Sequence, residues 1–92
     1  MHFTTNYLLL TTYMSTFHLI ITSVGETRFE GPAISATCPG SAGEFTVLAH
    51  HEPFVTTLKK GVITVRRDDG TKKYSIENGV LECSNNRTVV LL

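Results

Sequence analysis

Residues 61–92, "GVITVRRDDGTKKYSIENGVLECSNNRTVVLL", decide the fold of this chain. Short runs rich in β-branched and aromatic residues alternate here with turn-forming pairs, at Asp69–Gly70, Asn78–Gly79 and Asn85–Asn86. Such pairs adopt the positive φ angles that tight β-hairpins require. The stretch therefore predicts a meander of short antiparallel strands.

The residues before this stretch continue the pattern. Runs rich in strand-forming residues occur in "FHLIITS" (17–23), "TRFEG" (27–31), "AISATC" (33–38) and "EFTVLA" (44–49), and helical periodicity is nearly absent. The segment "EPFVTTLKKG" (52–61) is the one stretch that we expect to hold a helical turn. Many short strands with turn signals at close spacing predict an all-β sandwich or barrel.

Composition excludes several classes of protein. The chain has 92 residues, enough for one small domain, and its 8 basic and 8 acidic residues cancel. Nucleic-acid binding requires a basic surface, so no nucleic-acid partner is expected. Cys38 and Cys83 show no metal-ligand spacing and lie in apolar, strand-like runs. We expect two buried, reduced thiols.

The N-terminal segment has no charged residue before Glu26. Thr, Ser and Asn interrupt it throughout, and its longest apolar run is Tyr7–Leu10, far short of a membrane-spanning helix. The basic region of a signal peptide is absent as well. We expect residues 1–13 to be a tail and residues 14–92 to be the domain, with Met14 as an alternative start.

The candidates for reactive chemistry are few. His50, His51 and Glu52 suggest a metal site, but consecutive strand residues point to opposite faces and rarely hold one ion together. The glycines of "GSAGE" (40–44) fit neither the nucleophile motif G-x-S-x-G nor a phosphate-binding loop. No catalytic, cofactor or metal site is predicted. The residues by themselves indicate a non-enzymatic all-β module whose function is open.

A longer stretch, "PGSAGEFTVLAHHEPFVTTLKKGVITV" (39–65), resembles the N-terminal domain of the epsilon subunit of F-type ATP synthases. That family reads approximately P-G-x-x-G-E-[FL]-G-[VI]-L-P-x-H-x-P, and this chain departs from it at Thr46, usually Gly, and at Ala49, usually Pro. "FHLIITS" is similar to the first strand of the family, with Ile20 where an aspartate is usual. "NGVLECSNNRTVVLL" (78–92) is similar to its last strands.

The resemblance implies a flattened β-sandwich of two antiparallel sheets with about ten short strands. It implies a non-catalytic rotor subunit that links the gamma subunit to the ring of c subunits and couples proton transport to ATP synthesis. Such a subunit lies at the cytoplasmic face of the bacterial cell membrane, peripheral through the complex and without direct membrane insertion. By position, a loop of Ser41, Ala42, Gly43 and Glu44 would face the c-ring, and His51 and Thr56 would face gamma.

Longer members of that family continue into two C-terminal helices, which can inhibit ATP hydrolysis and in some bacteria bind ATP. This sequence stops at Leu92, so the resemblance implies no helical hairpin and no nucleotide binding here. Two other classes stay open. The first is a free-standing β-sandwich that binds protein or carbohydrate, and the second is a small metal-dependent enzyme built on His50, His51 and Glu52.

Overall fold

The computed structural model describes residues 15–92. The predicted tail, residues 1–13, and the alternative start at Met14 lie outside the described residues. Residues 15–92 form strands and no helix, which confirms the all-β prediction. The nine strands are β1 Phe17–Ser23, β2 Glu26–Ala33, β3 Ser35–Gly40, β4 Gly43–Leu48, β5 Phe54–Leu58, β6 Gly61–Arg67, β7 Gly70–Ile76, β8 Gly79–Ser84 and β9 Arg87–Leu91.

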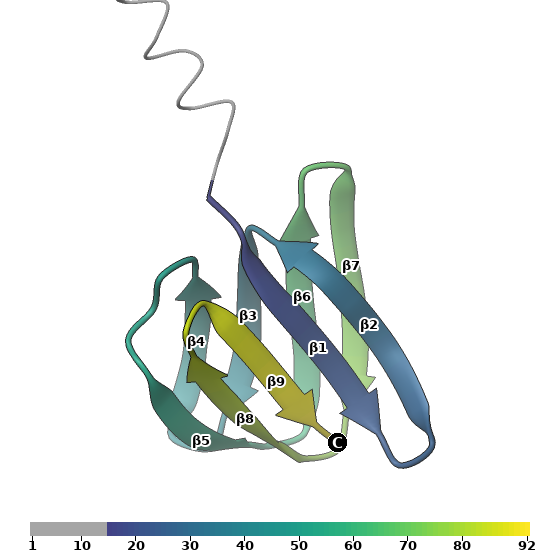
Figure 1. Cartoon of the computed structure of the whole chain (residues 1–92). Helices are drawn as coiled ribbons and strands as arrows, with labels where there is room; N and C mark the ends of the chain where they lie inside the picture. The colour runs from purple at the N-terminus through teal and green to yellow at the C-terminus, as the bar shows by residue number, and fades with distance from the viewer. Residues whose placement is uncertain (1–14) are drawn as a thin grey trace, which may run out of the picture.

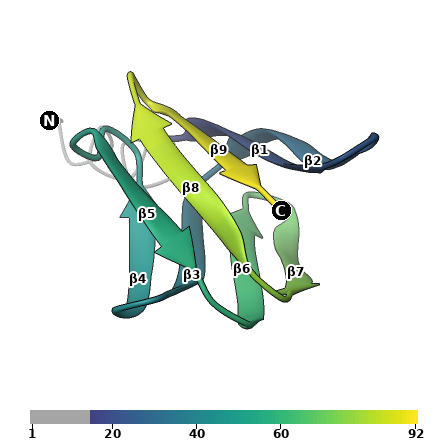
Figure 2. The same ribbon diagram turned by 90° about the horizontal axis from the view of Figure 1, so that it is seen from below.

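The strands lie in two layers, with β2, β1, β9 and β8 in one and β4, β3, β6 and β7 in the other (Figures 1 and 2). The hydrogen-bonded order β2-β1-β9-β8-β5-β3-β6-β7 runs through both layers, and β4 pairs with β3. The layers join at one corner, where Gly40 of β3 pairs with Leu58 of β5. The predicted flattened sandwich is therefore confirmed, and its two sheets are continuous through β5.

One pair of strands is parallel. β1 and β9 run in the same direction, with His18 opposite Arg87 and Thr22 opposite Leu91, while the other pairs of the described residues are antiparallel. Parallel neighbours need a long connection between them. Here the connection is the rest of the domain.

The core fills the space between the layers because alternate residues of each strand point inward. In β1, for example, Phe17, Leu19 and Ile21 are buried. Cys38 and Cys83 also point inward as free thiols, and burial raises the pKa of the Cys38 thiol to about 12. The core cluster consists of Phe17, Leu19, Ile21, Phe29, Ala33, Ala36, Cys38, Val47, Leu58, Ile63, Val65, Ile76, Leu81, Cys83 and Val90.

Two of the three predicted hairpins form. Asn85 and Asn86 both have positive φ angles, 52° and 58°, and join β8 to β9 as predicted. The turn from β6 to β7 consists of Asp68–Asp69, one residue earlier than predicted, and Gly70 follows as the first residue of β7 with φ 138°. Both turns reverse the chain in the way that their residues favour.

The prediction of a hairpin at Asn78–Gly79 is wrong. β7 pairs with β6, whereas β8 pairs with β5 and β9, so the chain crosses between layers at this point. Gly79 is needed for close packing: a Cβ there would lie 2.9 Å from the carbonyl oxygen of Leu91.

The expected helical turn within residues 52–61 is also wrong. Residues Phe54–Leu58 form β5, paired with β8 along its whole length. Val55, Thr56 and Thr57 are β-branched and favour the extended backbone, and Pro53 has no N–H to donate within a helix.

Candidate functional site

The predicted ring-facing loop is a tight turn at one end of the sandwich. Ser41 and Ala42 form the turn between β3 and β4, while Gly43 and Glu44 are the first residues of β4, and all four are exposed. Gly43 has φ 141°, a backbone conformation that residues with a side chain rarely adopt. The positive φ angle of Gly43 therefore determines the shape of the turn. The exposed tip of the turn is accessible to a partner.

Gly40 serves the same turn for another reason. A Cβ on Gly40 would lie 2.6 Å from the carbonyl oxygen of Gly43 and 2.8 Å from the ring of Phe45. The first glycine of the "PGSAGE" motif thus permits close packing of the hairpin on an aromatic ring, whereas the second provides a positive φ angle.

Hydrogen bonds attach this turn to β5. The Ser41 N–H donates to the carbonyl of Thr57 at 3.0 Å, and the Lys59 N–H donates to the carbonyl of Pro39 at 2.9 Å. The hydroxyls of Ser41 and Thr57 also share a hydrogen bond of 2.8 Å. The turn is consequently tied to β5, the strand through which the two sheets are continuous.

Glu44 places a carboxylate beside the tip. It lies opposite Pro39 in the β3–β4 ladder, and within residues 15–92 it forms no ion pair. An exposed carboxylate of this kind is available to a cationic or amide side chain of a partner.

His51 and Thr56 lie away from the turn. His51 is exposed in the loop between β4 and β5, its ring centroid 4.6 Å from that of Phe54, and its Nδ1 donates to the carbonyl of Glu52 at 2.8 Å. Thr56 is half-buried in the middle of β5, on the same side of the strand as Phe54. The turn and His51 are at opposite ends of β4, so the structure does not bring the predicted residues into one site.

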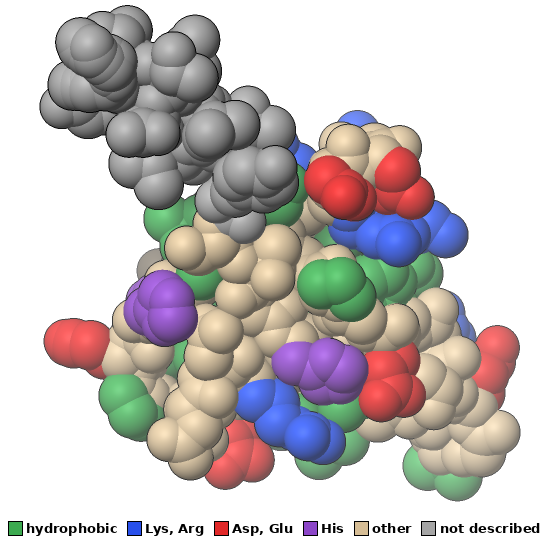
Figure 3. Space-filling model, turned by 45° about the horizontal axis from the view of Figure 1, so that its top comes forward, with side chains coloured by type: hydrophobic (Ala, Val, Ile, Leu, Met, Phe, Trp, Pro, Cys, Tyr) green, Lys and Arg blue, Asp and Glu red, His purple; other side chains and the backbone are tan. Residues whose placement is uncertain are grey.

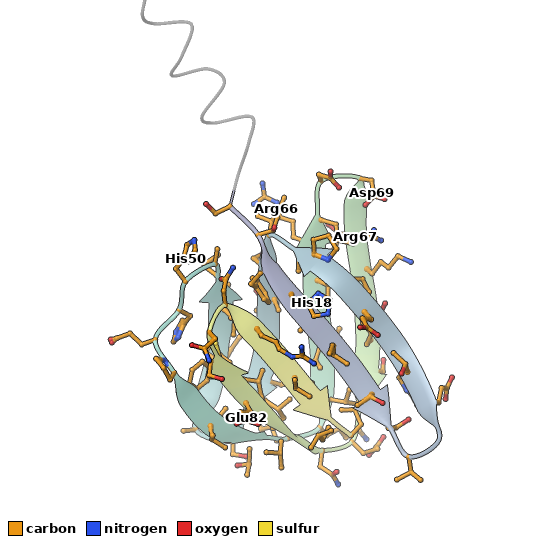
Figure 4. All side chains as sticks on the ribbon, in the orientation of Figure 1. His18, His50, Arg66, Arg67, Asp69 and Glu82 are labelled. Atoms are coloured by element: carbon orange, nitrogen blue, oxygen red, sulfur yellow. The ribbon has the colours of Figure 1, made fainter. Side chains whose placement is uncertain are left out.

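His50 points outward at the end of the molecule that carries the β4–β5 loop (Figure 4). Its backbone has φ 64°, and its N–H donates to Oδ1 of Asn86 at 2.7 Å. Within residues 15–92 no group of three or more His, Cys, Asp or Glu side chains is arranged to hold a metal ion, and this includes His51 and Glu52.

An apolar outer face on β5, β8 and β9 was not foreseen. Val55, Val80 and Leu91 expose 68%, 41% and 55% of their surface, and Val80 lies directly opposite Leu91. Glu82 of β8, labelled in Figure 4, lies opposite Val55 in the β5–β8 ladder. We call Val55, Val80 and Leu91 the apolar face. For Leu91 the available signal was the apolar run "VVLL" (89–92), because consecutive apolar residues leave a strand apolar on both sides.

Charge gives no comparable surface. Acidic and basic side chains lie next to one another on the face seen in Figure 3, without a broad region of one sign. This mixture agrees with the net charge of zero. Residues 15–92 contain no helix that could span a membrane.

Together these features define a β-sandwich domain with an exposed hairpin turn and exposed apolar side chains on one outer side. A family model described as "ATP synthase, Delta/Epsilon chain, beta-sandwich domain" matches residues 16–92. The chain belongs to this family. The resemblance drawn from the sequence is thereby confirmed, and membership agrees with the prediction that the chain is not an enzyme by itself.

Relatives named ATP synthase epsilon chain are similar over most of this chain. That of Bradyrhizobium sp. (strain ORS 278) is 36% identical over 78 residues, covering 85% of this chain and 58% of the relative. That of Sulfurimonas denitrificans is 36% identical over 80 residues, covering 86% of this chain and 62% of the relative. The chain thus spans about three-fifths of the length of these relatives.

Two solved assemblies contain a similar domain. A chain of the Euglena gracilis mitochondrial ATP synthase, OSCP/F1/c-ring, superposes with a TM-score of 0.77 at 25% identity, over 83% of this chain and 49% of that one. A chain of the Tetrahymena thermophila mitochondrial ATP synthase central stalk and c-ring superposes with a TM-score of 0.71 at 9% identity, over 80% and 60%. At 9% identity, the similarity to the Tetrahymena chain shows a shared fold only.

Proposed function

We propose that this chain is a non-catalytic central-stalk subunit of an F-type ATP synthase. In this role it links the gamma subunit to the c-ring and couples proton transport to ATP synthesis at the cytoplasmic face of the bacterial membrane. Family membership supports the proposal, as do the central-stalk and c-ring assemblies that hold similar domains.

The apolar face is the observation that carries the proposal. Val55, Val80 and Leu91 come from three adjacent strands and leave apolar surface in water on one side of the sandwich. Exposed apolar side chains gathered on one side of a domain favour a protein interface there. Gamma is the proposed occupant. His51 and Thr56 remain proposed gamma contacts beside this face, and Thr56 points to the other side of β5 from Val55.

The turn of Ser41, Ala42, Gly43 and Glu44 is the proposed ring contact. Its small residues let the tip approach another backbone, and Glu44 can pair with a polar or basic side chain of a ring loop. Both contacts can form at once, because the turn lies at an end of the sandwich and the apolar face along its side.

Binding to gamma tests the apolar face. Val80→Ser should weaken binding of the full chain to its gamma subunit about tenfold, since burial of a valine contributes roughly 1.5 kcal/mol. Val62→Ser is the matched control, because Val62 is exposed to 46% on β6 in the other layer. Calorimetry gives both affinities. Equal affinities of the two variants would place gamma elsewhere.

Proton pumping tests the turn. Glu44→Ala should leave thermal stability unchanged and lower ATP-driven pumping modestly in a reconstituted complex, because an exposed ion pair contributes about 0–1 kcal/mol. Asp68→Ala removes an exposed carboxylate from the β6–β7 turn at the opposite end (Figure 1) and should pump normally. A structural role for Glu44 would appear instead as a lower melting temperature.

A further inference from the structure

Ser41 and Thr57 face each other where the two sheets meet. Within residues 15–92 only one residue pair, Gly40 with Leu58, connects β3 to β5 in the strand ladder. Most neighbouring strands of the sandwich are joined by five or more pairs in register. The junction beside the turn therefore depends on a small number of individual hydrogen bonds.

The hydroxyl pair is the side-chain part of that junction. Ser41 is the first residue of the turn, and its Oγ lies 2.8 Å from Oγ1 of Thr57, next to the backbone bond from the Ser41 N–H to the Thr57 carbonyl. Thr57 follows Thr56 on β5 and lies opposite Val80 of the apolar face. One side-chain contact thus connects the turn to a neighbour of the apolar face.

We propose that Ser41 and Thr57 are positioning residues that hold the β3–β4 turn as a rigid extension of β5. The proposal rests on the proposed function, in which the turn contacts the c-ring and the apolar face contacts gamma. A subunit that transmits torque between two partners must be stiff between its two contacts. With the hydroxyl pair in place, displacement of the turn moves β5 and, through its five-pair ladder, β8.

Amide hydrogen exchange of the full chain tests the positioning directly. Thr57→Val removes the hydroxyl at nearly constant volume and keeps the Thr57 carbonyl. The Ser41 amide should then exchange about two- to tenfold faster, the factor that corresponds to the net contribution of one hydrogen bond. Thr57→Ser should restore the original rate. Thr56→Val is the matched control, because the Thr56 hydroxyl reaches only the carbonyl of Thr57, at 3.5 Å.

Two exchange results would overturn the proposal. One is an unchanged Ser41 rate in Thr57→Val, which would mean that the backbone bond alone fixes the turn. The other is equal acceleration in Thr56→Val, which would indicate a general loosening of β5.

The reconstituted complex supplies the second readout. Thr57→Val should lower proton pumping per ATP hydrolysed in complexes that contain the full amount of the variant, while its melting temperature stays unchanged, and Thr57→Ser should restore pumping. Normal pumping by Thr57→Val despite faster exchange would overturn the positioning role. Failure of the unaltered chain to bind gamma or the ring would instead overturn the proposed function, and the exchange comparison would still decide whether the hydroxyl pair holds the turn.

Discussion

The guanidinium carbon of Arg67 lies 5.4 Å from the centroid of the Phe29 ring, and this contact joins opposite ends of the sandwich's strand order. Phe29 belongs to β2 at one end, and Arg67 to β6 beside the last strand at the other. Tyr74 of β7 meets the same ring edge-on, with centroids 6.3 Å apart. Together the three side chains close the side of the sandwich where no ladder connects β2 to β7 within residues 15–92.

Replacing Arg67 should open this side. Arg67→Gln should lower the free energy of unfolding by about 0.5–1 kcal/mol, because it removes the partly buried cation–π contact and the 3.6 Å ion pair between Arg67 Nε and Asp69. Arg66→Gln is the control: Arg66 is exposed on the opposite side of the same strand and should change stability by less than about 0.5 kcal/mol. Urea denaturation measures both. Equal losses would mean that charge near the β6–β7 turn matters rather than the ring of Phe29.

Asn86 connects three segments of the chain. Its Oδ1 accepts the His50 N–H at 2.7 Å, its Nδ2 donates to the Thr16 carbonyl at 2.9 Å, and its own carbonyl accepts the His18 N–H at 3.1 Å. The side chain therefore ties the β8–β9 turn to the β4–β5 loop and to the approach of β1.

Asn86→Gly keeps the positive φ angle and removes only the side-chain bonds. We expect a loss of about 1–3 kcal/mol in the free energy of unfolding, the range for two hydrogen bonds. Asn85→Gly occupies the same turn with φ 52° and should cost much less, since no side-chain hydrogen bond of Asn85 is found in residues 15–92. Thermal unfolding distinguishes them, and similar melting temperatures for the two variants would contradict the connecting role.

Thr88 is a polar residue inside the core. It is fully buried in β9, and its Oγ1 has no hydrogen-bond partner among residues 15–92. Thr88→Val removes the unsatisfied hydroxyl at nearly equal volume and should raise the free energy of unfolding by about 1 kcal/mol. Thr22→Val should do the opposite, because the Thr22 hydroxyl donates to the Glu26 carbonyl at 3.0 Å. Destabilisation by Thr88→Val, measured in urea, would reveal a partner for its hydroxyl, such as a bound water.

The buried Cys38 thiol should make the folded protein less stable in alkaline solution. Burial raises its pKa from 9.0 to about 12, so the folded state keeps the thiol protonated while the unfolded state releases the proton above about pH 9. The contribution of Cys38 to the free energy of unfolding is fully present below pH 9. Between pH 9 and pH 12 this contribution falls by at most about 1.4 kcal/mol per pH unit. Cys38→Ala should show a shallower decline over this interval. Parallel stability curves for the two proteins would contradict the assignment.

The sequence predicted strands well where local chemistry determines them. The run "FHLIITS" predicted β1 with its observed bounds, because β-branched residues favour an extended backbone at their own positions. Asn85 and Asn86 formed the expected hairpin, because asparagine tolerates the positive φ angles that the turn requires. At Asn78–Gly79 the same local signal misled. The glycine is required there by the approach of Leu91, a contact between distant residues that a local pattern does not contain.

In the candidate site, too, local sequence predicted some features and missed others. The turn at Ser41–Ala42 followed from its flanking glycines, and the family resemblance supplied the partner assignments. The apolar face was missed because Val80 looks like a core residue until the neighbouring Leu81 is known to point inward. The hydroxyl contact between Ser41 and Thr57 lies where β3 and β5 pair at a single position. No periodic pattern in the sequence predicts such a contact.

The parallel pairing of β1 with β9 has a consequence for how the protein is made. During synthesis the β1–β2 hairpin leaves the ribosome before β9, and the edge of β1 that faces β9 stays unpaired until β9 has emerged. Contacts between residues so far apart in sequence carry a large loop-closure entropy and slow folding. We therefore expect the native pairing of this domain to form only after β9 has left the ribosome, and folding of the free domain to be slow for its size.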